Sequence, residues 1–111
     1  MRLLISSVFT LVIALFIYVA YADEQTTHPG KTVFNKWCVH CHSAGAGFAG
    51  TQRLAWSYGE DKSVLTQRTD LTVPYVKLMV RNGRGAMPAF RYVEISDEEL
   101  QALAAYLSRS Q

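Results

Sequence analysis

Cysteine and histidine are scarce in this chain of 111 residues, which contains two cysteines and three histidines. So few thiols exclude the set of disulfides that stabilises many small exported domains. They also exclude a zinc site built from two cysteine pairs. Basic residues form no run, and the net charge is only +2. The composition therefore gives no indication of nucleic-acid binding.

The two cysteines and one of the histidines form a single motif. Cys38, Cys41 and His42 follow the pattern C-x-x-C-H, which is the attachment signature for a c-type haem. Two thiols about one helical turn apart can form thioethers with the two vinyl groups of one haem. The imidazole of His42 can then serve as the proximal iron ligand. The motif predicts one covalently attached haem c.

Two other roles are compatible with this cysteine spacing. A thiol-redox pair should follow a strand of a βαβ unit, and no such pattern precedes Cys38. A zinc site could add His40 or His42 to the cysteines, but only His28 remains as a further ligand. Both roles stay as alternatives to the haem.

The N-terminus carries a long apolar run. A positive start is followed by almost wholly apolar residues from 3 to 20, and Ala20-Tyr21-Ala22 is typical of a signal-peptidase site. We expect residues 1–22 to be a cleaved secretory signal peptide and residues 23–111 to be one periplasmic domain. The alternative is an uncleaved membrane anchor, because the run is nearly long enough to span a bilayer.

Helical signals flank an irregular middle segment. Pro29 suits the first turn of a helix that ends in the haem motif. Another helix is expected from Thr72 to about Asn82. Between them, residues 51–70 show no clear period, and a short helix is expected over residues 60–67.

The last helix has the clearest boundaries. Ser96 and Glu99 form a capping box at its start. Its apolar stripe consists of Leu100, Leu103, Ala104 and Leu107. These signals together predict an all-α fold, with three to four helices around one haem.

A methionine in a loop is the candidate for the second iron ligand. Met87 stands between Gly85 and Pro88, and such a loop can fold over the open face of the haem. Pro88 stiffens the approach. We therefore predict Met87 as the distal ligand. Met79 lies on a helical apolar stripe, so a core position is expected for it.

Other residues have weaker assignments. The glycines at 45, 47 and 50 would let the backbone run close to the haem ring. Three hydrogen-bond donors could reach the haem propionates, or could be ordinary surface residues: Arg53, Trp56 and Tyr58. Three arginines near the Met87 loop could orient a redox partner, or could be ordinary solvated charges: Arg81, Arg84 and Arg91.

Taken together, these features resemble the class I c-type cytochromes. That resemblance implies that Gly30 and Phe34 pack across the last helix near Leu103 and Tyr106. The chain departs from many members of the family because residues 47–51 contain no Gly-Pro.

A closer resemblance lies around the Met87 loop. Val80-Arg81-Asn82-Gly83 and Ala86-Met87-Pro88-Ala89-Phe90 are similar to the cytochrome subunit of p-cresol methylhydroxylase-type flavocytochromes, which include eugenol hydroxylase. The resemblance implies a flavoprotein partner that oxidises 4-alkylphenols.

These assignments predict an electron carrier and not an enzyme. Ligation by both His42 and Met87 would leave no open iron position for a substrate, so one-electron transfer is the expected chemistry. The expected partners are a flavoprotein subunit and a downstream acceptor protein, with membrane attachment only if the signal peptide is retained. Three alternatives remain: a free-standing soluble shuttle to a terminal oxidase, a ligand-binding haem protein with a labile Met87, and a thiol oxidoreductase.

Overall fold

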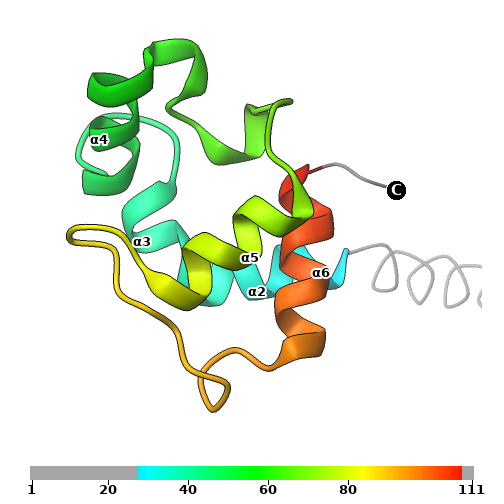
Figure 1. Cartoon of the computed structure of the whole chain (residues 1–111). Helices are drawn as coiled ribbons and strands as arrows, with labels where there is room; N and C mark the ends of the chain where they lie inside the picture. The colour runs from blue at the N-terminus through cyan, green and yellow to red at the C-terminus, as the bar shows by residue number, and fades with distance from the viewer. Residues whose placement is uncertain (1–27, 109–111) are drawn as a thin grey trace, which may run out of the picture.

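The computed structural model describes residues 28–108, so the predicted signal peptide lies outside the described residues. Figure 1 shows that the regular elements of this part are helices. They are α2 (Pro29–Trp37), α3 (Val39–His42), α4 (Ala49–Tyr58), α5 (Val73–Asn82) and α6 (Asp97–Ser108), with 3₁₀ turns η1 (Glu60–Lys62) and η2 (Leu65–Gln67). The all-α prediction is confirmed. Within residues 28–108, no helix has the length and apolar character needed to cross a membrane.

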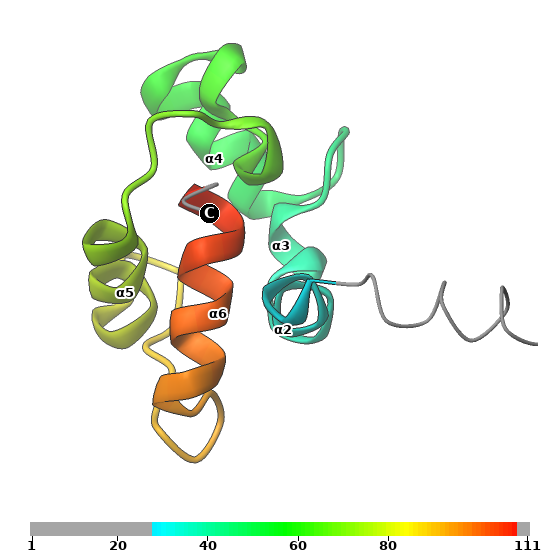
Figure 2. The same ribbon diagram turned by 90° about the vertical axis from the view of Figure 1, so that its right-hand side faces the viewer.

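Helix α6 lies between α2 and α5, as Figure 2 shows. The α2–α6 crossing is close because Gly30 has no side chain. A Cβ at Gly30 would overlap the carbonyl oxygen of Ala102 and lie 2.6 Å from the Cβ of Tyr106. The ring centroids of Phe34 and Tyr106 are 6.1 Å apart, and Leu103 is fully buried. The predicted packing of the first helix across the last is thus observed.

The helix ends follow from local capping. The Nδ1 atom of His28 accepts a hydrogen bond from the Gly30 N–H at 3.0 Å, immediately before α2. The Ser96 hydroxyl accepts from the Glu99 N–H at 3.2 Å, and the Glu99 carboxylate accepts from the Ser96 N–H at 2.9 Å. The predicted capping box of α6 is therefore formed.

The middle segment differs from the prediction. Helix α4 was not expected, because Thr51 is its only buried residue and its apolar residues do not form a buried stripe. The single helix predicted over residues 60–67 is instead two separate 3₁₀ turns. The first of these ends where the Ser63 hydroxyl donates to the Glu60 carbonyl at 2.8 Å.

The apolar core lies on one side of the domain. No apolar side chain from residue 38 to residue 70 is fully buried, and Trp56 on α4 is 88% exposed. The core comes from α2, α5, α6 and the segments that lead into α5 and α6. Its members are Val33, Phe34, Leu71, Val76, Val80, Ile95, Leu100, Leu103, Ala104 and Leu107.

Candidate haem site

The haem motif occupies one tight turn. The helix predicted to run through the motif is interrupted at Cys38, and α3 begins a new turn after it. The Cys38 carbonyl accepts from the N–H groups of Cys41 and His42 at 3.1 and 2.9 Å. Both cysteines are free, and Cys41 is exposed. The structure thus brings the three predicted attachment residues together.

The protonation of Cys38 argues against a thiol-redox site. Burial, together with the neighbouring Cys41, raises the pKa of Cys38 to about 11. Reactive cysteines in disulfide oxidoreductases have a lowered thiol pKa, because the thiolate is the nucleophile. Cys38 is protonated at neutral pH in this fold. Cys38 is therefore not activated as the nucleophile of a thiol oxidoreductase.

His42 is held in a form that can bind a metal. Burial lowers the pKa of its imidazole, so the ring is neutral and keeps a lone pair for iron. Its Nδ1 atom is buried and has no hydrogen-bond partner within residues 28–108. In the part of the chain that the structure describes, no carbonyl oxygen therefore orients the imidazole through this atom.

Gly50 at the start of α4 lies directly against the His42 ring. A Cβ at Gly50 would be 2.6 Å from Cε1 and 2.8 Å from Nδ1 of the imidazole. The close neighbour of Gly50 in the structure is the imidazole, and the expected approach of this glycine to the haem ring stays a prediction. A Cβ at Gly45 or Gly47 would meet nothing within 4 Å. In this protein the imidazole of His42 therefore packs against a glycine, Gly50, and not against a proline.

Hydrogen bonds fix this contact from the side of α4. The buried hydroxyl of Thr51 donates to the Ser43 carbonyl at 2.7 Å. The Ser43 hydroxyl in turn donates to the Val39 carbonyl at 2.8 Å. These bonds tie the first turn of α4 to α3. They therefore keep Gly50 against the imidazole.

Met87 lies in a tight turn between α5 and α6. Arg84 and Met87 exchange two backbone hydrogen bonds of 3.0 Å. Gly83 has a φ of 67°, and a Cβ there would be 2.5 Å from the Met87 carbonyl oxygen. Gly85, inside the turn, has a φ of 59°. Because both positions favour glycine, the sequence specifies this loop shape.

The Met87 side chain is half-buried and packs against the core. The edge of the Phe90 ring meets Trp37, with 5.8 Å between the ring centroids. Trp37 immediately precedes Cys38, so the end of the Met87 loop contacts the helix that carries the haem motif. Met79, expected in the core, is only half-buried, between the buried Val76 and Val80.

The remaining candidates are dispersed. Arg53, Trp56 and Tyr58 lie exposed on α4, and their contact with haem propionates stays a prediction. Arg84 is exposed, and Arg91 pairs with Glu94 at 3.5 Å. Arg81 is different, because its side chain is 18% exposed and is engaged inside the protein. No local sequence pattern distinguishes Arg81 from Arg84 and Arg91.

The residues present fit a covalent haem. The motif supplies two free thiols and a neutral imidazole, and Met87 supplies a thioether. The segment from residue 38 to residue 70 lacks an apolar core of its own. The Nε1 atom of Trp37 is buried without a partner within residues 28–108. A flat, largely apolar cofactor beside α3 would complete this half of the domain.

A comparison with protein-family models shows which family the chain belongs to. The model described as cytochrome c oxidase, cbb3-type, subunit III matches residues 25–107. This chain belongs to the cytochrome c family. As a cytochrome c it carries a covalent c-type haem and serves electron transfer, and it is not itself a catalytic enzyme.

The relatives of this cytochrome c include cytochromes c6 and a subunit of a dehydrogenase. Cytochrome c6 from Leptolyngbya boryana is 38% identical over 79 residues, which are 70% of this chain and 85% of that protein. The cytochrome c subunit of 4-cresol dehydrogenase (hydroxylating) from Pseudomonas putida is 38% identical over 89 residues, which are 80% of this chain and 66% of that subunit. Cytochrome c6 from Gloeothece citriformis is 30% identical over 108 residues, which are 96% and 93% of the two chains. No solved structure matches.

Proposed function

We propose that this cytochrome c is a periplasmic one-electron carrier whose haem is held by Cys38, Cys41, His42 and Met87. Its electrons come from a flavoprotein subunit that oxidises 4-alkylphenols, and they pass on to an acceptor protein. Residues 1–22 act as a cleaved signal peptide. The observation that carries the attachment residues is the single turn that holds two free thiols and a neutral, half-buried imidazole.

Each ligand residue has a separate task. The haem supplies reversible one-electron chemistry when bound. Cys38 and Cys41 hold it covalently, so that it stays in place in either oxidation state. His42 presents a neutral nitrogen, and Gly50 limits the rotation of the imidazole by contact with its edge. Met87 provides a neutral thioether, which favours the reduced state of the iron more than a second imidazole would.

The same ligand set limits the chemistry. If both His42 and Met87 bound the iron, no iron position would be left for a substrate. The contribution of the chain is then ligation, burial and exclusion of water. This supports a carrier and not a peroxidase or a ligand-binding haem protein.

The flavoprotein partner is supported by the relative from Pseudomonas putida, whose name describes a subunit of 4-cresol dehydrogenase. Oxidation of a 4-alkylphenol delivers two electrons to a flavin, whereas one haem accepts one. The cytochrome must therefore be reduced twice for each substrate molecule. A bound carrier suits such repeated single transfers, because it does not have to diffuse between them.

A second candidate is a free-standing shuttle to a terminal oxidase. The relative from Gloeothece citriformis supports it, because the alignment spans 93% of that cytochrome c6 and 96% of this chain. The alignment with the 4-cresol dehydrogenase subunit spans only 66% of that protein. The two candidates share the haem site and differ in whether a flavoprotein stays bound.

Two methionine variants test the ligand set. Met87→Ala should keep its haem through denaturation but lose the weak near-red Met–Fe(III) absorption band, lower the reduction potential and let the reduced protein bind CO. Met79→Ala is the matched control and should keep the band. If Met87→Ala left the band and potential unchanged, the distal assignment would be wrong. Loss of the band in Met79→Ala alone would transfer that role to Met79.

Isolation of the native protein tests the partner. A flavoprotein subunit predicts that flavin fluorescence co-elutes with the haem, and that adding 4-cresol reduces the haem within the complex. A haem protein that elutes alone, and that 4-cresol does not reduce in the presence of the cell's flavoproteins, would favour the free shuttle.

A further inference from the structure

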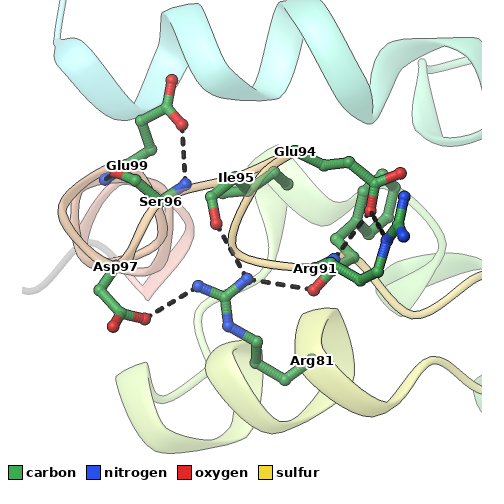
Figure 3. A network of polar contacts seen from close by, with 8 residues as sticks. Arg81, Arg91, Glu94, Ile95, Ser96, Asp97 and Glu99 are labelled. Carbon is green, nitrogen blue, oxygen red and sulfur yellow. Dashed lines mark hydrogen bonds and ion pairs between the residues drawn. The ribbon is translucent and has the colours of Figure 1, made fainter.

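The Arg81 side chain makes several contacts at the end of α5. Its Nη1 donates to the carbonyl oxygen of Phe90 at 3.1 Å. Figure 3 shows two further contacts, from Nη1 to the carbonyl oxygen of Ile95 at 2.9 Å and from Nη2 to Asp97 at 2.9 Å. The guanidinium also lies 4.3 Å from the centroid of the Tyr92 ring. One side chain thus binds groups that are 9 to 16 residues further along the chain.

These contacts close the base of the Met87 loop. The Phe90 N–H donates to the Val80 carbonyl at 2.8 Å, and the Phe90 carbonyl accepts from Arg81. Both backbone groups of Phe90 are therefore bound to consecutive residues of α5. Phe90 follows Met87 by three residues, so the chain that leaves the loop is fastened to the helix that enters it.

The same guanidinium continues to the start of α6. Ile95 is fully buried, and Asp97 is the first residue of that helix. Arg81 therefore connects α5, the exit of the loop and α6. A guanidinium can do this because its planar fork donates several hydrogen bonds at once, whereas the ammonium of a lysine cannot reproduce that geometry. Nothing comparable is seen at Arg84, whose side chain is exposed.

We propose that Arg81 is a positioning residue that holds the Met87 loop closed and so controls how readily an outside ligand replaces Met87 on the iron. This inference rests on Met87 being the distal ligand, as proposed above. Replacement requires the thioether to move away, and the loop can move far only if the contacts of Phe90 are broken. Hydrogen bonds from a charged, largely buried donor make that opening rare.

The test is displacement of Met87 by imidazole in the oxidised, haem-loaded protein. Loss of the near-red band is followed in time at saturating imidazole, where the rate reports how often the loop opens. Arg81→Ala should raise this rate by roughly tenfold or more. Arg81→Lys should raise it less, because it keeps the charge. Asp97→Asn should have the smallest effect, since the Asp97 side chain is 71% exposed and the two carbonyl contacts persist.

Two control variants separate positioning from charge and from general stability. Arg91→Ala removes the same charge next to Phe90, but its side chain is 76% exposed, so its rate should stay within about twofold of the parent. Leu107→Ala removes a buried side chain at the far end of α6. It should lower the stability without raising the displacement rate.

The outcomes are distinct. An unchanged rate in Arg81→Ala, or equal acceleration in Arg81→Ala and Leu107→Ala for equal losses of stability, would overturn the proposal. If Arg81→Ala does not fold, the order of Arg81→Lys and Asp97→Asn decides the question, and two unchanged rates would overturn it. If the parent protein has no Met–iron band, the ligand set fails first and the role of Arg81 fails with it.

Discussion

The two halves of this cytochrome c bury their side chains in opposite ways. In the group formed by α2, α5 and α6, apolar side chains interlock, and Ile95 and Leu103 are completely buried. In the segment from residue 38 to residue 70, the buried residues are polar or charged: Thr51, Ser63 and Arg68. The largest apolar side chain of α4, that of Trp56, is 88% exposed. The first half forms an apolar core from its own side chains, whereas the second half does not.

This difference explains why the attachment motif lies where it does. A small domain buries too little apolar surface to support every element, so a covalent cofactor can supply what is missing. Cys38 and Cys41 stand at the junction of the two halves, where α2 ends and α3 begins. A haem fixed there adds apolar surface to the half that lacks it. The cofactor is thus expected to act in folding as well as in electron transfer.

Removal of both attachment residues should give the largest effect and is the strongest test of this comparison. Cys38→Ala combined with Cys41→Ala should abolish covalent haem, so that denaturation separates the colour from the chain. Amide hydrogen exchange, measured by mass spectrometry on the unloaded protein, should then be fastest over residues 43–70. The amides of α2 and α6 should keep more of their protection. Equal loss of protection in both halves would show that the haem does not support residues 43–70 more than the packed helices.

A glycine-to-alanine substitution in each half tests the difference between the halves more closely. Gly30→Ala should lower the free energy of unfolding by about 1–3 kcal/mol, because the new Cβ overlaps the Ala102 carbonyl in the packed half. It should leave the haem spectrum unchanged. Gly50→Ala should change the haem spectrum, because its Cβ meets the imidazole of His42 as well as the carbonyl oxygen of Cys41. Its spectrum and reduction potential should change more than its stability.

Denaturant unfolding and visible spectra of both glycine variants provide the measurement. Each protein serves as the control for the other, since both add one methyl group at a helical glycine. A spectral change in Gly30→Ala as large as that in Gly50→Ala would mean that the two halves respond as one unit. The site would then not be separable from the packed helices.

How much the sequence could predict follows the same division. The starts of α5 and α6 were predictable because Thr72 and Ser96 cap them locally. The attachment motif was predictable because its residues are contiguous. Helix α4 was missed because helices are predicted from a stripe of apolar residues that packs against the rest of the protein. Helix α4 has no such stripe. Residues that pack against a cofactor do not have to follow the apolar spacing of a helix that packs against protein.

Two positions at the site depend on contacts that no local pattern encodes. Gly50 is brought to His42 by the fold, through the bond from Thr51 to Ser43. Arg81 resembled the exposed Arg84 in the sequence, because its partners lie 9 to 16 residues away. Glycine and arginine have many roles, and only tertiary structure selects among them. These two residues therefore required the structure.

The smallest predicted effect concerns the polar pair that supports the second half. The buried Arg68 guanidinium binds both carboxylate oxygens of Asp70 at 2.8 Å, and Lys62 lies 3.5 Å away. The hydrogen bond from Arg68 holds the pKa of Asp70 well below its ordinary value of 3.8. The folded state therefore favours the ionised carboxylate more than the unfolded state does. Its stabilising contribution is complete above about pH 5 and is lost progressively as the pH falls towards the lowered pKa of the folded state.

Asp70→Asn should remove this pH-dependent contribution. Urea midpoints should be lower in the variant at pH 7, and the two proteins should begin to converge as the pH is lowered from about 5 to about 3, because the unfolded parent then takes up a proton that the folded parent does not. Asp61→Asn removes the same charge from the same segment and is the matched control. A constant difference between Asp70→Asn and the parent at every pH would show that the amide disturbs packing instead. Convergence would show that this half depends on a charged hydrogen bond where the other half depends on apolar contact.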